Sequence, residues 1–468
     1  MITASLIKKC PHCEIVGEIK NYLSVSTDSR KIVSGQIFIA LVGDKFDGSH
    51  YAQEVAKKGA GLIVLNDSDT NLNIGKKIWS EFKVPVVLTK DSLLFLQELA
   101  AFYREDWKSQ NGQRRIIGIT GSNGKTTHKE MLFHLLNKLM PNQVLATEGN
   151  LNNHIGVPLT LLKITPEHQL AIVEMGMNHP GEISILCKIA GPDCGIITNI
   201  GYAHMEFLGG QQEIFNEKRC LFDYVFLRNN PDPFFVICQD DEYLAKLPNL
   251  SGVTFFGEKS QDVLLEIVGD IYLFKYNDQE ISLNLKSIFG KHNKKNMAAC
   301  FLLALKIFPE KLDELKRAVA SYQAPENNRS QWVYRNNKRY FLDAYNANPG
   351  SMMASLEAFL AWVQDEKISP SDCLMVLGDM NELGVHSEEM HKKIGEWMVK
   401  SGFKNVLYVG RFSKYYLEGD PKGKSYDTTE LLKKDWQDLA NSFKFFFLKG
   451  SRTVQLESLI ENVMISGH

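Results

Sequence analysis

Residues 116–127, Ile-Ile-Gly-Ile-Thr-Gly-Ser-Asn-Gly-Lys-Thr-Thr, combine an apolar run, a glycine-rich turn and a Lys-Thr pair. Glycines let backbone N–H groups approach phosphate oxygens closely, and a helix N-terminus adds favourable positive potential. Lys125 would hold β- and γ-phosphate oxygens, and the Thr126 hydroxyl would face Mg²⁺. We therefore predict that a nucleoside triphosphate binds these loop residues: Gly121, Ser122, Asn123, Gly124, Lys125, Thr126 and Thr127.

The loop departs from the strict motif G-x-x-x-x-G-K-[ST] at one position, because Ile119 stands where the first glycine would be. The shorter pattern G-x-x-G-K-T-T remains. A run of strand character precedes it, and the segment that follows places Met131, Leu132 and Leu135 on one face of a predicted helix. This strand–loop–helix context favours nucleotide binding over a chance glycine-rich turn.

Three further residues could place a metal beside the loop, because ligands of open parallel sheets gather beyond the carboxyl ends of the strands. Glu174 follows a predicted strand at 170–173, and its carboxylate could ligate Mg²⁺ or simply face solvent. His204 follows a strand predicted at 195–199 and could serve a metal–phosphate site or an ordinary structural role. Lys218 falls inside a predicted helix, where the residue alone indicates a solvated surface position.

Polar segments also begin or follow elements later in the chain. Asn293 lies in a His-Asn helix start, which could meet a purine ring but by itself favours plain capping. Segments 343–351 and 377–384 each follow a predicted strand and are too polar and turn-rich for a core. A site at a domain interface and ordinary turn chemistry both remain open for these two loops.

The elements that must position these residues fall into three parts, as a length of 468 residues suggests at ~150 residues per domain. Residues 1–90 mix short strands with turns. Residues 91–325 begin with an amphipathic helix at 92–103 and end in a helix-rich stretch at 293–320. Residues 326–468 form a second alternating unit. Strands predicted at 116–120, 170–175, 195–199 and 234–238, with helices between them, indicate an α/β protein with a mostly parallel sheet.

Composition excludes several classes of function. The net charge of −2 provides no basic field, so we expect no nucleic-acid partner. No apolar run approaches the ~18 residues of a membrane span, and the first residues lack a signal-peptide core, so we predict a cytoplasmic location.

Eight cysteines make no disulfide framework in a chain this long. Cys10-Pro-His-Cys13 could be a redox pair or half a zinc site, but two ordinary thiols are favoured.

Together these segments resemble the Mur ligases, the ATP-dependent amide-forming enzymes of peptidoglycan precursor synthesis. Residues 120–127 are similar to the family loop T-G-x-N-G-K-T-T. The absence of a glycine at Ile119, just before this loop, is then a mark of the family. The resemblance covers nearly the whole chain. Segments 150–158, 343–351 and 448–452 resemble the subgroup that adds a dipeptide. The D-N-P-R-type loop of the diaminoacid-adding relative is absent from the sequence.

The resemblance implies a catalytic centre with ATP and two Mg²⁺ ions. It assigns catalytic roles to Lys125, Lys218, His204 and Glu174, and metal contacts to Thr126, Glu174, His204 and Lys218. Lys218 would be carbamylated, which turns an amine into an anionic ligand. Asn293 and Arg329 would hold adenine and phosphates, although Asn328 stands where the family usually has glycine before the arginine. Asn381 likewise replaces a usual glycine, and asparagine tolerates positive φ.

The resemblance also implies three domains: a small α/β UDP-substrate domain at 1–90, a central P-loop ATPase domain at 91–325 and a C-terminal Rossmann-like domain at 326–468. Predicted substrate contacts in the first domain, where a capped turn is the alternative, are Ser26, Thr27, Ser29, Arg30, Lys45, Phe46 and Asp47. Those predicted in the other two domains are Asn152, Asn153, Asp343, Asn346 and Asn348.

The reaction implied by the resemblance joins D-alanyl-D-alanine to the terminal carboxylate of UDP-N-acetylmuramoyl-tripeptide. An acyl phosphate made with ATP would be the intermediate, and the pentapeptide, ADP and phosphate the products. We expect a monomer with no membrane insertion. Two alternatives remain, namely another ligase of the same superfamily, of the folylpolyglutamate-synthase type, and a nucleotide-dependent switch without ligase activity.

Overall fold

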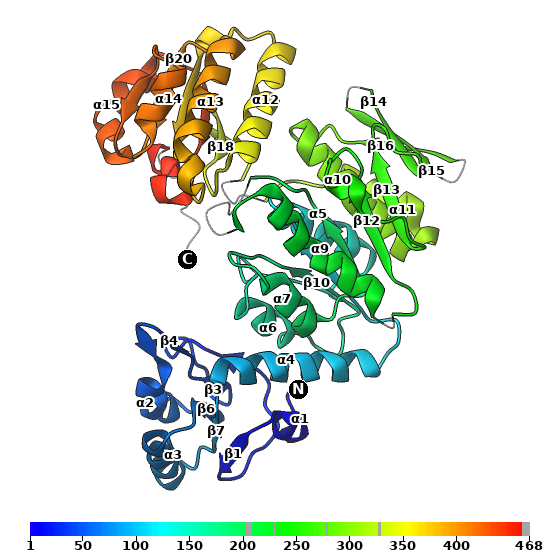
Figure 1. Cartoon of the computed structure of the whole chain (residues 1–468), viewed down its shortest axis with the longest axis vertical. Helices are drawn as coiled ribbons and strands as arrows, with labels where there is room; N and C mark the ends of the chain where they lie inside the picture. Colours follow the sequence, from blue (N-terminus) through cyan, green and yellow to red (C-terminus); the bar gives the residue numbers. More distant parts are fainter. Residues whose placement is uncertain (203–207, 229, 269, 277–278, 326–328, 461–468) are drawn as a thin grey trace.

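The protein, seen in a computed structural model, consists of three α/β regions arranged in chain order from one end of the molecule to the other (Figure 1). The structure describes residues 1–202, 208–228, 230–268, 270–276, 279–325 and 329–460. Within them, the main sheets have five, nine and six strands. The predicted α/β class is therefore confirmed. None of the described helices is long and apolar enough to cross a membrane.

The N-terminal sheet has the order β1-β7-β6-β3-β2, and its pairs are parallel except for β1 against β7. Its strands are β1 (Cys13–Val16), β2 (Val25–Ser26), β3 (Ile37–Ile39), β6 (Leu62–Asn66) and β7 (Val86–Thr89). Helices α1 (Ala4–Lys9), α2 (Ala52–Lys57) and α3 (Asp69–Phe82) accompany it. A two-stranded hairpin, β4 (Val42–Gly43) with β5 (Phe46–Asp47), projects from this region and exposes Phe46 to solvent.

The central sheet has the order β16-β15-β14-β13-β12-β11-β8-β10-β9 and is parallel from β9 to β14. Its parallel strands are β8 (Arg115–Thr120), β9 (Val144–Ala146), β10 (Leu170–Glu174), β11 (Cys194–Ile197), β12 (Phe234–Cys238), β13 (Val253–Gly257) and β14 (Val263–Val268). The antiparallel strands β15 (Ile271–Tyr276) and β16 (Gln279–Asn284) extend one edge. Because β8 lies between β10 and β11, the segments that follow these three strands leave the sheet side by side.

Separate apolar cores cover the two faces of the central sheet, as near-continuous apolar strands require. One face carries α5 (Lys125–Leu139), α10 (Lys291–Ile307) and α11 (Leu312–Ala320). The other carries α4 (Ser92–Ser109), α6 (Gly156–Leu161), α7 (Glu182–Ala190) and α9 (Gln211–Leu227). The helix-rich stretch predicted at 293–320 is two helices, because Pro309 begins a short 3₁₀ turn between α10 and α11.

The C-terminal sheet has the order β17-β18-β22-β19-β20-β21, with only β17 antiparallel to its neighbour. Its strands are β17 (Gln331–Arg335), β18 (Lys338–Asp343), β19 (Cys373–Gly378), β20 (Asn405–Val409), β21 (Lys424–Tyr426) and β22 (Phe445–Lys449). One face packs on α12 (Pro349–Asp365) and α13 (Ser387–Ser401), near α14 (Ser413–Gly419), and the other on α15 (Thr429–Asn441). The second alternating unit predicted from the sequence is therefore present.

Helix α4 joins the N-terminal and central regions and packs against elements of both (Figure 1). Asp91 caps its first turn by accepting from the Leu93 and Leu94 amides, at 2.8 and 3.2 Å. The buried Arg104 near its C-terminal end donates to the Lys188 carbonyl oxygen in α7 (3.2 Å). Helix α4 is thus fixed to the central region by polar as well as apolar contacts.

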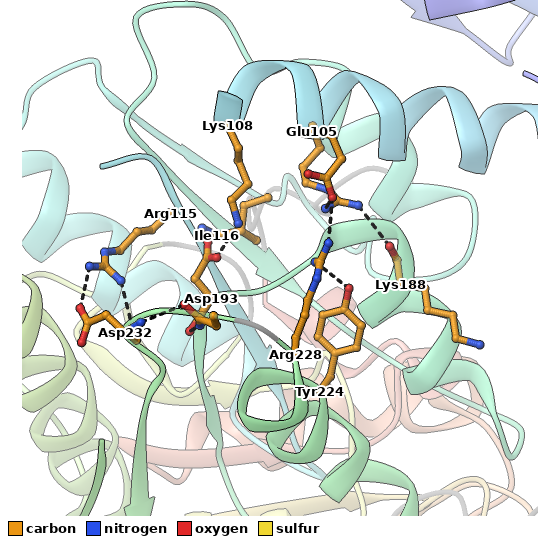
Figure 2. Close-up of polar contacts among 11 residues, drawn as sticks. Glu105, Lys108, Arg115, Ile116, Lys188, Asp193, Tyr224, Arg228 and Asp232 are labelled. Atoms are coloured by element: carbon orange, nitrogen blue, oxygen red, sulfur yellow. Dashed lines mark hydrogen bonds and ion pairs between the residues drawn. The ribbon is translucent and has the colours of Figure 1, made fainter. Parts of the chain in front are cut away.

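A network of polar contacts gathers at the edge of the central sheet where the parallel strands begin (Figure 2). The carboxylate of Asp193, just before β11, pairs with Lys108 of α4 and accepts from the Ile116 amide of β8 at 2.8 Å. Arg228, after α9, donates to Glu105 of α4 at 2.9 Å and to the Tyr224 hydroxyl at 2.8 Å. The network therefore aligns α4 with the first residues of the strand that leads to the glycine-rich loop.

The Cys10–Cys13 segment has the character of ordinary thiols. All eight cysteines are free, and burial raises the pKa of both Cys10 and Cys13 above the usual value. A thiol with a raised pKa carries little thiolate at neutral pH, and the thiolate is the form that reacts or binds metal.

Replacing Asp193 with alanine should lower the free energy of unfolding by about 2–3 kcal/mol, because a buried amide and an ammonium both lose a charged acceptor. Asp232→Ala is the matched control. Its carboxylate pairs with Arg115 at 2.8 Å but is 63% exposed, so its loss should cost under about 1 kcal/mol. Urea unfolding followed by circular dichroism measures both, and equal losses would contradict the role given to Asp193.

Candidate active site

A cavity of about 640 Å³ opens where the carboxyl edge of the central sheet meets the C-terminal region. The predicted residues that line it are Ser122, Asn123, Gly124, Lys125, Thr126, Thr127, Asn152, Asn153, Glu174, Asn293, Arg329, Asp343 and Asn346. They come from segments more than 200 residues apart in the chain. The predicted residues of the N-terminal region do not line it, nor do Gly121, Lys218 and Asn348, and His204 lies outside the described residues.

The glycine-rich loop is held in shape by the end of β11. A side chain at Gly121 (φ 149°) would place its Cβ 1.8 Å from the Thr198 hydroxyl oxygen, so the close approach requires glycine. The Asn123 amide donates to the Asn199 side chain at 3.1 Å, and the Asn123 carbonyl accepts from Thr198 and from Asn199. Gly124 (φ 77°) then precedes α5 as its N-cap, in a left-handed conformation. Hydrogen bonds to the end of β11 thus fix the shape of the loop.

Lys125, the first residue of α5, folds back over this loop. Its Nζ donates to the carbonyl oxygens of Gly121 at 2.7 Å and Ser122 at 3.4 Å. Burial lowers the pKa of its ammonium, and Glu174 opposes that effect. The amine thus stands at the mouth of the loop, where it can exchange backbone carbonyls for phosphate oxygens.

Glu174 ends β10 with a carboxylate that is only half satisfied. Its Oε1 accepts from the Thr126 hydroxyl at 3.2 Å and from Asn152 Nδ2 at 2.8 Å. Its Oε2 is buried without a hydrogen-bond partner among the described residues. A buried carboxylate oxygen needs a positive partner, and carboxylate and hydroxyl oxygens are the ligands that Mg²⁺ prefers. Thr126 and Glu174 therefore fit a magnesium ion at this point.

Lys218 is buried, so its interpretation as a solvated surface lysine is wrong. It lies in α9 at 1% exposure, and no hydrogen bond or ion pair of its ammonium is seen within the described part of the chain. Burial, with a smaller effect of Lys125, holds the pKa of Lys218 well below its usual value. The neighbouring Glu217 accepts from the Gly181 and Ile183 amides, each at 2.8 Å, and so ties α9 to the start of α7.

On the C-terminal side, Asp343 and Lys449 form a buried ion pair of 2.5 Å at the ends of the paired strands β18 and β22. The Ser355 hydroxyl adds a hydrogen bond of 2.7 Å to the same Asp343 oxygen. Burial alone would raise the pKa of Asp343, but Lys449 and Ser355 hold it below its usual value. Asp343 is therefore an anion that is already paired with groups of the C-terminal region.

One hydrogen bond joins the two sides of the cavity directly. Asn348 Nδ2 donates to Asn123 Oδ1 of the glycine-rich loop. The same Asn348 caps α12 in a capping box with Ser351, whose amide donates to its Oδ1 at 3.0 Å. The N-termini of α5 and α12 consequently face one cavity. Nearby, the guanidinium carbon of Arg329 lies 3.8 Å from the centroid of the Tyr345 ring.

Among the cavity residues that are not predicted from the sequence are Asn296, Asn199 and Lys449. His292, the histidine of the predicted His-Asn helix start, lines the cavity as well, and Asn296 follows it in the same helix. Lys449 lies in the 448–452 segment. Burial lowers the pKa of His292 to about 4, so its ring is neutral. In the 377–384 loop Glu382 (φ 63°) and Gly384 (φ 54°) are left-handed, and Asn381 is not.

The residues predicted in the N-terminal region make local turns beside an exposed aromatic pair. Arg30 pairs with Asp28 at 2.9 Å, and Asp47 Oδ1 accepts from the Ser49 amide at 2.8 Å. Phe46, 52% exposed, stacks on Tyr51 with ring centroids 5.9 Å apart. The capped turns expected as the alternative are present, and an aromatic face and a guanidinium remain accessible with them.

Comparison with known proteins gives this architecture a family. Family models match the Mur ligase family catalytic domain at residues 21–104, the Mur ligase middle domain at 119–304 and the Mur ligase glutamate ligase domain at 328–447. UDP-N-acetylmuramoyl-tripeptide–D-alanyl-D-alanine ligase of Treponema pallidum is 32% identical over 94% of this chain and 93% of the relative. The chain belongs to the Mur ligase family. The Escherichia coli ligase of the same name is 29% identical over 100% of the chain and 99% of the relative.

Solved structures of Mur ligases share the whole fold. MurF from Acinetobacter baumannii superposes with a TM-score of 0.83 at 29% identity, covering 98% of both chains. MurF from Thermotoga maritima, solved in complex with ADP, gives 0.78 at 27% identity over 95% of this chain and 98% of that one. The likeness spans all three regions, so the regions are arranged much as in these Mur ligases.

Replacing Glu174 with glutamine should weaken the strengthening of nucleotide binding by Mg²⁺, because the neutral amide keeps the shape but offers no anionic oxygen. The metal-dependent gain in affinity for a non-hydrolysable ATP analogue should fall roughly tenfold or more, as seen by isothermal titration calorimetry with Mg²⁺ or with EDTA. The exposed Glu167, in the loop before β10, supplies the control Glu167→Gln. An unchanged gain in the Glu174 variant would refute the cation site.

Proposed function

We propose that the protein joins the terminal carboxylate of UDP-N-acetylmuramoyl-tripeptide to the amine of D-alanyl-D-alanine, with ATP as the energy source. The observation that carries the proposal is the single cavity in which the glycine-rich loop meets the polar loop of the C-terminal region through Asn123 and Asn348. One side of that cavity suits a triphosphate, and the other can present a second substrate. The names of the full-length relatives support the same reaction.

The chemistry needs an activated acyl group, because a free carboxylate is a poor electrophile. The substrate carboxylate attacks the γ-phosphorus of ATP, the bond to ADP breaks, and an acyl phosphate forms. The neutral amine of the dipeptide then attacks the acyl carbon, the amide forms, and phosphate leaves as the amine gives up a proton. Lys125 and the loop N–H groups stabilise the charge that spreads over the phosphoryl oxygens. The C-terminal region shields the acyl phosphate from water.

The metal contacts we propose are Thr126, Glu174, His204 and Lys218, the last as a carbamate. Bound Mg²⁺, two ions in the family pattern, neutralises phosphate charge. The burial of Lys218 favours the neutral amine, and only a neutral amine adds CO₂ to give a carbamate and a proton. The buried surroundings of Lys218 thereby favour the modification chemically.

We propose Asn293 and Arg329 for adenine and phosphates, within the central domain at 91–325. The C-terminal domain, 326–468, supplies the substrate contacts Asp343, Asn346 and Asn348, with Asn152 and Asn153 opposite. Because its carboxylate is paired with Lys449, Asp343 acts by shaping its loop as well as by lining the cavity.

The N-terminal domain, 1–90, would bind the UDP part of the substrate. The proposed contacts are Ser26, Thr27, Ser29, Arg30, Lys45, Phe46 and Asp47. An exposed aromatic ring suits a nucleobase, and a guanidinium suits a diphosphate. A UDP-linked substrate and ATP are intracellular metabolites, so we place the enzyme in the cytoplasm, as a monomer.

The wild-type protein should release phosphate from ATP only when both UDP-muramoyl tripeptide and D-alanyl-D-alanine are present, with the pentapeptide seen by mass spectrometry. Lys125→Ala should lower turnover at least about 100-fold while calorimetric binding of the UDP-substrate is retained. Lys138→Ala, an exposed lysine of the same helix, is the matched control. Phosphate release without either substrate would indicate a nucleotide switch, and glutamate incorporation into folate would indicate the other ligase type.

Lys218→Ala should lose activity that short carboxylic acids such as acetate partly restore, because a free carboxylate can occupy the space of the carbamate. The rate is followed by phosphate release against acid concentration. Chloride at equal ionic strength is the control for a general salt effect. If the alanine variant keeps wild-type activity, or if no acid restores any, the carbamate assignment is wrong.

A further inference from the structure

The segment 147–152, which follows β9, clamps the end of β10 at two points. At its start, the Thr147 amide donates to the Ile172 carbonyl at 3.0 Å, and the Thr147 hydroxyl accepts from the Glu174 amide at 3.0 Å. At its end, Asn152 Nδ2 donates to Glu174 Oε1 at 2.8 Å, and the Asn152 carbonyl accepts from the Gly176 amide at 2.8 Å. Both the backbone and the carboxylate of Glu174 are thus oriented by this one clamp segment.

The start of the clamp segment is fastened by a buried ammonium. Lys129 of α5 is 3% exposed, and its Nζ donates to the Thr147 carbonyl oxygen at 2.8 Å. Its other partner is the carboxylate of Glu130 at 2.7 Å. Thr147 itself is 1% exposed, so water does not compete for these contacts. Lys129 does not line the cavity and cannot touch a substrate there.

Helix α5 therefore reaches Glu174 by two routes. Thr126, in its first turn, bonds the carboxylate directly at 3.2 Å. Lys129 lies three residues later, on the same face of the helix, and acts through Thr147. A buried ammonium is costly to place, and apolar side chains would fill the same space at lower cost, so the contact indicates a requirement for position.

We propose that Lys129 is a positioning residue that holds the clamp segment 147–152, and through it the free carboxylate oxygen of Glu174, in place for the cation bound with ATP. The inference rests on the proposed function only in taking Glu174 as a ligand of that cation. Without Lys129, the Thr147 carbonyl loses the one charged donor that it has among the described residues, and the clamp segment can shift. The carboxylate then turns away from the place where a cation and the triphosphate meet.

The test compares the affinity of a non-hydrolysable ATP analogue in Mg²⁺ with its affinity in EDTA, by isothermal titration calorimetry. Lys129→Met should lower the metal-dependent gain about tenfold, the size of effect typical when the support of a metal ligand is removed. Thr147→Val, which keeps the shape but removes the hydroxyl, should lower it in the same direction, and Thr147→Ser should restore it. Lys138→Met, at an exposed lysine of α5, should leave it unchanged.

The affinity in EDTA reports whether the glycine-rich loop is intact in each variant, and it should stay within about twofold of the wild type. A gain like that of the wild type in both Lys129→Met and Thr147→Val would overturn the proposal, as would equal losses in Mg²⁺ and EDTA. The measurement needs no ligase turnover. If the wild-type protein fails to make the pentapeptide, the proposed function is refuted. The comparison of affinities in Mg²⁺ and EDTA still tests the role of Lys129.

Discussion

The parallel pairing of β8 with β10 on one side and β11 on the other is the constraint on which the site depends. Parallel register brings the ends of the three strands to one edge, so the glycine-rich loop, Glu174 and Thr198–Asn199 emerge as neighbours. The loop then takes its shape from hydrogen bonds to the end of β11, and the carboxylate takes its orientation from segments beside β10. No single strand carries enough polar groups to make this site.

At the opposite edge of the central sheet, where the parallel strands begin, polar contacts hold helix α4 against the sheet. There, the Asp193 carboxylate accepts from the Ile116 amide of β8 and pairs with the ammonium of Lys108, while Arg228 donates to Glu105 of the same helix α4 (Figure 2). Helix α4 connects this edge to the N-terminal region, so that region is anchored to the sheet through one helix. The C-terminal region, in contrast, meets the central one at the cavity itself, through Asn348.

Local patterns predicted much of the fold and of the nucleotide loop, because strands, helices and the glycine-rich loop depend mainly on residues close in sequence. The strand at 116–120 and the glycine turn after it are examples, and so is the carboxylate at the end of β10. Lys218 could not be placed from periodicity, since its burial comes from strands and helices distant in sequence. The pairing of Lys449 with Asp343 depends on the adjacency of β18 and β22, which no local pattern specifies. The helix-rich stretch predicted at 293–320 is present, and Pro309 marks the break between α10 and α11 within it.

The bond between Asn348 and Asn123 uses only a side-chain amide of the loop. The backbone amide and carbonyl of Asn123 are already committed to Asn199 and Thr198 within the central region. Separation of the C-terminal region would thus leave the phosphate-binding backbone unchanged. The loop is preorganised, so a nucleotide that enters before the two regions meet has no loop to reshape.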